Sequence, residues 1–296
     1  MKVAVVGAGS IGLLYAIRTQ EAGHEVTLFV RREQQIELIC NKGIQVEGES
    51  MMYDIHVKNI MDISGAFDLI IIATKQTHVK KIVELVKVNE IVAPLLFLQN
   101  GMGHIEDIHE IINPTAIGII EHGARKLSDR TVAHTGVGVT RIAAVTMKQE
   151  DLIIYKQMLE SSHFPYKLEN DWFEVMSDKL IINAVINPLT SIFKVVNGEV
   201  VNNPNLFRIA KKLCEEACDA LGKASVEYHL DRVKKVAMQT KDNHSSMLED
   251  IKNGRRTEIE GISGYLLKRA NDELPYTTFV YEGVQAMQQM DRREYE

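Results

Sequence analysis

Cysteine is scarce in this sequence, with only Cys40, Cys214 and Cys218 among 296 residues. So few cysteines cannot form the framework of a small disulfide-rich secreted domain. Cys214 and Cys218 have i, i+4 spacing, at which two thiols on a helix could meet, but we interpret all three cysteines as reduced thiols. The ten histidines are scattered, with no HExxH motif and no Cys/His cluster. We therefore predict no metal site.

Long apolar runs and an excess of positive charge are also missing. No apolar run approaches the roughly 20 residues that span a membrane, and no charged-then-apolar leader precedes the first strand-like run. The formal net charge is -6, which argues against nucleic acid or an anionic membrane as the main partner. We expect a cytoplasmic protein that binds neither nucleic acid nor a membrane.

The length and the pattern of the chain favour two domains. A chain of 296 residues exceeds what one compact core usually holds. Its composition, 45% hydrophobic and 25% charged, is ordinary for a soluble globular protein. Strands are expected over residues 2–6, 25–29, 54–57, 67–73, 95–98, 116–120 and 137–143, with helices over 13–22, 79–88 and 151–161. A linker is expected over 165–171, and helices dominate after it.

A glycine motif lies between the first strand and the first helix. Residues 7–12 read G-x-G-x-x-G. In this context the first glycine allows a tight turn, the second lets backbone N–H groups approach a pyrophosphate, and the third lets the helix pack closely on the strand. The N-terminus of the helix adds partial positive charge. We predict that a dinucleotide binds at Gly7, Ala8, Gly9, Ser10, Ile11 and Gly12.

Together these features predict an α/β fold class. Residues 1–168 are expected to form an N-terminal Rossmann-type doubly wound parallel sheet that binds NADP. Residues 169–296 are expected to form an all-α substrate and catalytic domain.

The end of the second strand indicates which dinucleotide binds. An NAD site has an Asp or Glu there, about 20 residues past the glycines, to accept from the ribose 2′-hydroxyl. This chain has Arg31 and Arg32 instead. A guanidinium suits the 2′-phosphate of NADP and leaves the diol of NAD without its acceptor. We predict NADPH, with Arg31 as the first choice. Glu33 is a competing acceptor, and two solvated loop arginines are the alternative.

Two polar residues follow later strands of the expected sheet. Lys75 comes after the strand at 67–73, and Asn100 comes after the strand at 95–98. Ligands of open α/β sheets bind beyond the carboxyl ends of the strands, so we expect both side chains to face the cofactor. Ordinary loop chemistry is the alternative, because Asn-Gly is a common turn.

A helix early in the second half has Lys179, Asn183 and Asn187 at i, i+4 and i+8. These positions spread over about 80° of arc and share one face. The residues between them are apolar, so the helix should be buried. A buried ammonium or amide without a partner costs several kcal/mol, so these groups either pair within the core or face a polar cavity. Pro188 is expected to stop or kink the helix directly after Asn187.

Ser246 and Glu258 are further candidates with ordinary alternatives. Ser246 lies on a short predicted helix, where its hydroxyl could cap the helix or bond to the carbonyl four residues back. Glu258 follows an Arg-Arg pair at a helix start, where a carboxylate complements the helix dipole.

Taken together, these residues resemble the ketopantoate reductase (2-dehydropantoate 2-reductase) family over essentially the whole chain. The resemblance rests on the opening glycine motif with Arg31, Gln-Asn-Gly-Met-Gly around Asn100, Lys179-x3-Asn183-x3-Asn187-Pro, and Ser246-Met with Arg-x-Thr-Glu258-Ile. It implies a Rossmann domain followed by an all-helical domain, with the site in the cleft between them. It also implies NADPH-dependent reduction of 2-dehydropantoate to (R)-pantoate, on the pathway to pantothenate and coenzyme A.

The same resemblance implies roles for individual residues. Lys179 would be the general acid. Cofactor contacts would include Lys75, Asn100 and Glu258, and the substrate would be bound by Asn100, Asn183, Asn187, Ser246 and Glu258. The additional arginine at Arg32 leaves open which guanidinium holds the 2′-phosphate, and residues 41–63 show no family feature.

Two other functions are compatible with the sequence. A reductase of the same architecture could act on another small 2-keto acid, because one fold hosts many substrates. A non-catalytic NADP-sensing protein is the second alternative, but it would not need the ammonium of Lys179 and the carboxylate of Glu258. The sequence leaves the oligomeric state open, a homodimer included.

Overall fold

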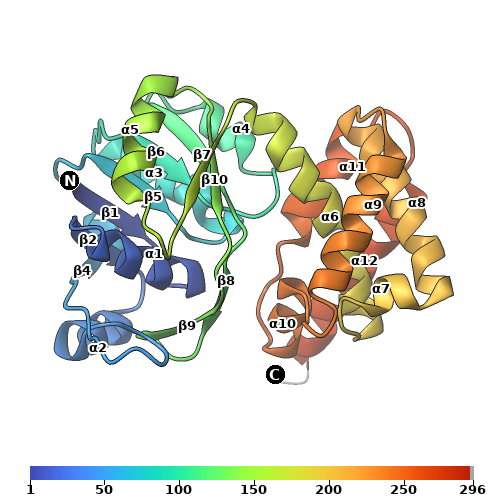
Figure 1. The fold of residues 1–296 in the computed structure, drawn as a ribbon, viewed down its shortest axis with the longest axis horizontal. Coiled ribbons are helices and arrows are strands. Elements are labelled where there is room, and N and C mark those ends of the chain that lie inside the picture. Colours follow the sequence, from blue (N-terminus) through green and yellow to red (C-terminus); the bar gives the residue numbers. More distant parts are fainter. Residues whose placement is uncertain (294–296) are drawn as a thin grey trace. The chain divides into compact units, whose positions relative to one another are not determined.

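The computed structural model describes residues 1–293, which form two compact units (Figure 1). The first unit comprises Met1–Gln99 and His104–Trp172. The second comprises Asn100–Gly103 and the described residues from Phe173 onward. The division thus falls after Trp172, whereas we predicted it after residue 168. The short segment Asn100–Gly103 belongs to the second unit, although it follows a strand of the first.

The first unit is built on an eight-stranded sheet in the order β11-β10-β7-β6-β5-β1-β2-β4. Its strands are β1 (Lys2–Val6), β2 (Glu25–Val30), β4 (His56–Asn59), β5 (Leu69–Ile72), β6 (Leu95–Phe97), β7 (Thr115–Ile120), β10 (Thr140–Ala144) and β11 (Tyr166–Glu169). Neighbours run parallel, except that β10 is antiparallel to β7. The predicted Rossmann-type α/β architecture is confirmed, including short all-apolar strands such as β5, which is buried throughout.

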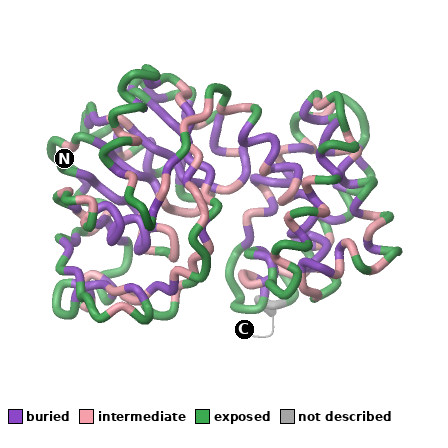
Figure 2. The backbone as a smooth tube through the Cα atoms, in the orientation of Figure 1, coloured by how far each residue is buried: buried purple, intermediate pink, exposed green. Residues whose placement is uncertain are grey.

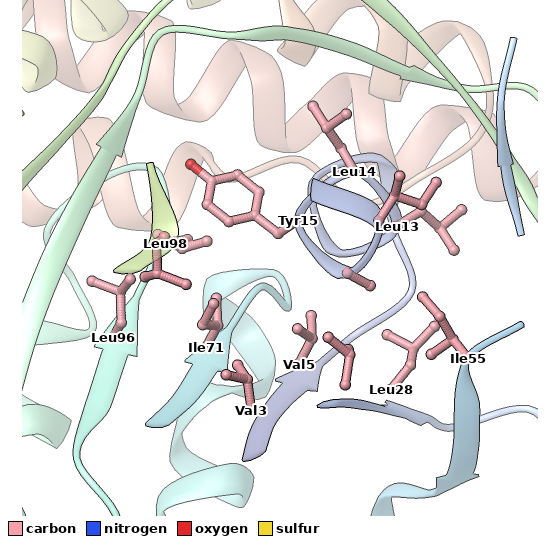
Figure 3. Packing of buried hydrophobic residues seen from close by; sticks show 14 of the residues in the cluster. Val3, Val5, Leu13, Leu14, Tyr15, Leu28, Ile55, Ile71, Leu96 and Leu98 are labelled. Atoms are coloured by element: carbon pink, nitrogen blue, oxygen red, sulfur yellow. The ribbon is translucent and has the colours of Figure 1, made fainter. Parts of the chain in front are cut away.

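Helices cover this sheet. They are α1 (Ser10–Glu21), α2 (Glu33–Lys42), α3 (Val79–Val88), α4 (Ile105–His109) and α5 (Gln149–Leu159). In Figure 3, Val5 of β1 and Ile71 of β5 point from the sheet toward α1, which presents Leu13 and Tyr15 to the core. All four side chains are fully buried, and each such burial contributes about 1.5–3 kcal/mol. Figure 2 shows the same pattern along the chain, with buried strands and exposed connecting turns.

A small second sheet was not predicted. It contains β3 (Gln45–Val46), β9 (Thr131–Gly136) and β8 (Gly123–Lys126), with β8 and β9 antiparallel. No strand was expected between residues 120 and 137, and the strand expected at 137–143 begins at Thr140. These short strands are only partly buried, so they lack the continuous apolar signal of β1 or β5.

The predicted linker at 165–171 is wrong in part, because it contains β11. This strand pairs in parallel with β10 at the edge of the large sheet. Only its first residue, Tyr166, is fully buried. An edge strand of mixed polarity is hard to distinguish from a loop by its sequence.

The second unit is helical, as predicted. Its helices are α6 (Trp172–Phe193, whose first residue still counts with the first unit), α7 (Glu199–Asn202), α8 (Pro204–Leu221), α9 (Val226–Gln239), α10 (Ser246–Lys252), α11 (Tyr265–Arg269) and α12 (Pro275–Arg293), with a π-helical turn at Glu260–Gly264. Residues at each end of α8 mark its limits. The Asn203 side chain caps its N-terminus, and Gly222 at φ +66° ends it. No helix within residues 1–293 is long and apolar enough to cross a membrane.

Pro188 lies inside α6 and does not end it, contrary to one of the two outcomes we expected. The helix continues to Phe193. Proline removes a single backbone donor, and hydroxyl groups bond to the carbonyls around it. Thr190 Oγ1 donates to the Ile186 carbonyl at 2.8 Å, and Ser191 Oγ donates to the Asn187 carbonyl at 2.7 Å. The residues from Ala184 to Ser191 around the proline are all buried.

The glycine turn fixes how α1 leaves β1. Gly7 has φ +108°, a conformation that glycine adopts far more readily than other residues. A Cβ on Gly12 would lie 1.8 Å from the Gly7 carbonyl oxygen, so the first turn of α1 can pack this closely only with glycine. At Gly9 a Cβ would meet nothing within 4 Å. Gly7 and Gly12 are therefore required by the local backbone and packing, whereas the structure has room for a side chain at Gly9.

This difference predicts a large loss of stability at one glycine of the motif and almost none at another. Gly12→Ala should lower the free energy of unfolding by at least about 2 kcal/mol, because α1 must move away from β1. Gly9→Ala, the matched control, should change it by less than about 0.5 kcal/mol. Urea unfolding without nucleotide measures both. Equal effects of the two substitutions would contradict the close packing at Gly12.

Candidate active site

The N-terminus of α1 is suited to an anion. Gly9 is its N-cap, with no side-chain cap hydrogen bond, and the first turn has no acidic residue. Backbone N–H groups at a helix start and the helix dipole together attract phosphate. Because Gly9 is exposed and has no neighbour where a Cβ would lie, a phosphate can approach the backbone closely. The residues present therefore fit the predicted dinucleotide.

Arg31 and Arg32, directly after β2, have different surroundings. Arg32 forms an ion pair with Asp129 and donates to Gln35 Oε1 at 3.1 Å. Arg31 is exposed, and its guanidinium has no hydrogen bond or ion pair with any residue that the structure describes. An anion can thus bind Arg31 without breaking an existing pair. Glu33, the competing acceptor, already accepts a hydrogen bond from the Asn59 amide.

Lys75 lies beside the glycine turn. It follows β5 by a few residues and is half-buried. Its neighbour Thr74 packs so close to Gly7 that a Cβ there would be 2.9 Å from the Thr74 methyl carbon. The structure therefore brings Lys75, Arg31 and the glycine turn into one unit at the carboxyl ends of β1, β2 and β5.

The turn between β8 and β9 adds residues that the sequence analysis missed. Lys126 Nζ donates to the Ala8 carbonyl at 3.1 Å and lies 3.0 Å from Asp129 Oδ1. Gln35 Nε2 donates to the Ala8 carbonyl at 3.2 Å and to the Asp129 carbonyl at 2.7 Å. Burial raises the pKa of the Asp129 carboxyl, but hydrogen bonds from Arg32 and Lys126 outweigh it and hold that pKa below its ordinary value. No local sequence signal connects Asp129 with Arg32, which lies 97 residues away.

In the second unit, α6 presents a narrow accessible strip. Between Val175 and Ser191, only Lys179, Ile182 and Asn183 are not fully buried. The Asn183 side chain has no hydrogen bond to any described residue. Asn187 lies one turn further along and is 7% exposed. Lys179 and Asn183 are thus polar groups on the open part of a buried helix, as a site residue requires.

Asn100 and Glu258 are brought together within the second unit. Asn100 Nδ2 donates to Glu258 Oε2 at 3.3 Å. The adjacent loop is fixed by the backbone, since the Met102 N–H donates to the Gly261 carbonyl at 2.9 Å. Two residues selected from separate motifs, 158 positions apart, are therefore direct neighbours.

Ser246 is not the cap of α10. That role belongs to Ser245, whose hydroxyl accepts from the Leu248 N–H at 3.2 Å and forms a hydrogen bond with Thr190 Oγ1 at 2.7 Å. Ser245 is 5% exposed. Ser246 is exposed, and its hydroxyl has no hydrogen bond to the residues that the structure describes. The capping alternative for Ser246 is therefore removed.

Comparison with known protein families gives matches over both halves of the chain. A family model described as ketopantoate reductase PanE/ApbA matches residues 3–146. The model of the ketopantoate reductase PanE/ApbA C terminal matches residues 171–288.

Individual proteins are similar over nearly their whole length. The 2-dehydropantoate 2-reductase of Bacillus subtilis (strain 168) is 36% identical, over 97% of this chain and 98% of that protein. The 2-dehydropantoate 2-reductase of Shigella flexneri is 30% identical, over 96% of this chain and 94% of that protein. The crystal structure of the probable 2-dehydropantoate 2-reductase from Bacillus subtilis has a TM-score of 0.87, at 36% identity over 97% of this chain and 100% of that one. A D-mandelate dehydrogenase solved with NADH shares the fold, with a TM-score of 0.89 and 23% identity. The match covers 98% of this chain and 99% of that one.

Ser245 and Ser246 should differ in their contribution to stability, because only Ser245 caps α10. Ser245→Ala should lower the free energy of unfolding by about 1–2 kcal/mol, because α10 loses its cap and Thr190 loses a hydrogen-bond partner. Ser246→Ala should change it by less than about 0.5 kcal/mol. Thermal unfolding of both variants measures this. A larger loss for Ser246→Ala would reverse the assignment of the cap.

Proposed function

This chain belongs to the ketopantoate reductase family, and we propose that it reduces 2-dehydropantoate to (R)-pantoate with NADPH. The observation that carries the proposal is the family match over both domains, at residues 3–146 and 171–288. The accessible strip of α6 supports it, because the strip holds the lysine and an asparagine of the family motif.

We assign the nucleotide to the first unit. The backbone of Gly7, Ala8, Gly9, Ser10, Ile11 and Gly12 would hold the pyrophosphate at the start of α1. Arg31 would bind the 2′-phosphate, because its guanidinium has no competing carboxylate among the described residues. Lys75 would contact the cofactor from the end of β5. When bound, the reduced nicotinamide supplies a hydride to the ketone carbon.

Lys179 would act as the general acid. Negative charge develops on the ketone oxygen as the carbon is reduced, and a positioned ammonium stabilises that charge and donates the proton. The half-buried position of Lys179 on α6 limits the number of conformations its side chain can adopt. Its backbone is fixed by buried neighbours on both sides, including Asp178 and Leu180.

The other polar residues would bind and orient the substrate. Asn183, Asn187 and the hydroxyl of Ser246 can hydrogen-bond the carboxylate and hydroxyl of the keto acid. The hydrogen bond between Asn100 and Glu258 would keep both side chains in fixed orientations. Glu258 could then accept from the substrate hydroxyl or from Lys179, and Asn100 could contact the cofactor as well.

The initial rate of NADPH consumption with 2-dehydropantoate tests this function directly. A panel of other 2-keto acids distinguishes the same-fold alternative, which requires faster turnover of a different acid. Tight NADPH binding without turnover of any acid would favour a sensing protein. A cytoplasmic location stays a prediction, and the oligomeric state stays open, a homodimer included.

Replacement of the proposed acid should separate chemistry from cofactor binding. Lys179→Ala should lower kcat at least about 100-fold and change the Kd of NADPH by less than about twofold, because the glycine turn and Arg31 are intact. Lys212, which is 52% exposed and paired with Glu215, provides the matched control Lys212→Ala. Steady-state kinetics and fluorescence titration measure the two effects. Turnover of Lys179→Ala at the wild-type rate would reject Lys179 as the acid.

The two arginines after β2 should differ in their effects. Arg31→Ala should raise the Kd of NADPH by about tenfold or more, because a charged hydrogen bond is worth about 1.5–3 kcal/mol. The Kd of NADH should change by less than about twofold. Arg32→Ala should have the smaller effect on NADPH, since Arg32 is already paired with Asp129. An equal loss of both nucleotides in Arg31→Ala would remove its role at the 2′-phosphate.

A further inference from the structure

Lys126, the last residue of β8, brings a further cation to the glycine turn. Lys126 is 29% exposed, and its ammonium lies 3.1 Å from the carbonyl oxygen of Ala8, inside the glycine motif. On its other side it pairs with Asp129 at 3.0 Å. An ammonium has three N–H donors, and these contacts use two of them. A donor therefore remains for an anion at this position.

The carboxylate in this cluster pairs with Arg32, which follows the second strand, where an NAD site has its acidic residue. In NAD sites, that residue follows the second strand and accepts from the ribose diol. Here Asp129 arrives from a distant turn and is occupied by Arg32 and Lys126. Its own backbone is fixed as well, because its carbonyl accepts from Gln35 Nε2 at 2.7 Å. Arg32 and Lys126 share one oxygen of this carboxylate, Oδ1, so the negative charge of Asp129 is balanced by two neighbouring cations.

We propose that Lys126 is a second phosphate-binding cation for the ribose 2′-phosphate and that Asp129 is its positioning residue. This inference rests on the proposed use of NADPH. Arg31 follows the end of β2, and Lys126 reaches the Ala8 carbonyl of the glycine motif from the end of β8. A doubly charged phosphate takes hydrogen bonds from both cations, whereas the diol of NADH gains little from either. The turn is thus a determinant of NADPH over NADH.

Asp129 contributes by fixing the cations before the nucleotide binds. A lysine side chain that is already held in place loses less conformational freedom on binding than a solvated one. The hydrogen bonds of Gln35 to Ala8 and to Asp129 link the turn and the glycine motif into one network. The distance between the ammonium and the phosphate site therefore depends on Asp129.

Equilibrium titration of the full-length protein with NADPH and with NADH tests the proposal without any turnover. Lys126→Met should raise the Kd of NADPH about tenfold or more and that of NADH less than about twofold. Lys126→Arg should restore NADPH binding to within about threefold, because the charge is kept. Lys87, a lysine of the same unit paired with Glu110 at 3.1 Å, provides the matched control Lys87→Met. Raising the salt concentration should shrink the difference between wild type and Lys126→Met.

Specific outcomes would overturn the proposal. Equal weakening of NADPH and NADH in Lys126→Met, with unchanged thermal stability, would show that Lys126 does not sense the 2′-phosphate. Unchanged NADPH binding in that variant would remove its role altogether. Asp129→Ala should weaken NADPH about three- to tenfold and leave NADH nearly unchanged. Tighter NADPH binding in Asp129→Ala would show that the carboxylate only repels the phosphate.

Failure of the proposed function can be distinguished from failure of the inference about Lys126. A protein that binds NADPH but does not reduce 2-dehydropantoate rejects the proposed function, and the response of Lys126→Met still decides the inference. A wild-type protein that binds NADPH and NADH equally well rejects the role of Lys126 and the preference for NADPH together.

Discussion

The close approach of Gly12 to the Gly7 carbonyl is the constraint on which the nucleotide-binding unit depends. It sets α1 directly against the end of β1, with no room for a side chain between them. The N-terminus of α1 is thereby held at the carboxyl ends of β1, β2 and β5, where Arg31 and Lys75 also lie. A fixed helix start offers backbone donors and partial positive charge without any conformational cost at the moment of binding. The remaining polar groups of this unit are arranged around that point.

The cations around the glycine turn differ in whether they are paired with a carboxylate. Arg32 and Lys126 share the carboxylate of Asp129, while Arg31 has no such partner among residues 1–293. The paired cations are fixed in position, and the unpaired one can bind an anion without first losing a partner. Both properties favour a phosphate over a diol. The preference for NADPH is thus proposed from a network, of which the arginine after β2 is one part.

In the helical unit, the candidate site residues lie on α6, on the segment Asn100–Gly103 and at Glu258. Most of α6 is buried, and between Val175 and Ser191 its accessible strip is limited to Lys179, Ile182 and Asn183. The segment Asn100–Gly103 leaves β6 and is fixed to this unit by the hydrogen bonds of Asn100 to Glu258 and of Met102 to Gly261. Residues that follow a strand of one unit thereby become part of the other. The membership of this segment also explains how motifs far apart in the sequence contribute to one cluster.

The sequence by itself determined the features that depend on near neighbours along the chain. These are the strand–turn–helix of residues 2–21, the caps of α8 at Asn203 and Gly222, and the buried character of α6, because propensity, capping and apolar periodicity act within a few residues. Tertiary structure alone decided the β8–β9 hairpin, the edge strand β11, the continuation of α6 through Pro188 and the choice of Ser245 over Ser246 as a cap. It also decided that Asp129 pairs with Arg32 across 97 residues. Such pairings follow from the packing of distant segments, whose energy no local pattern encodes.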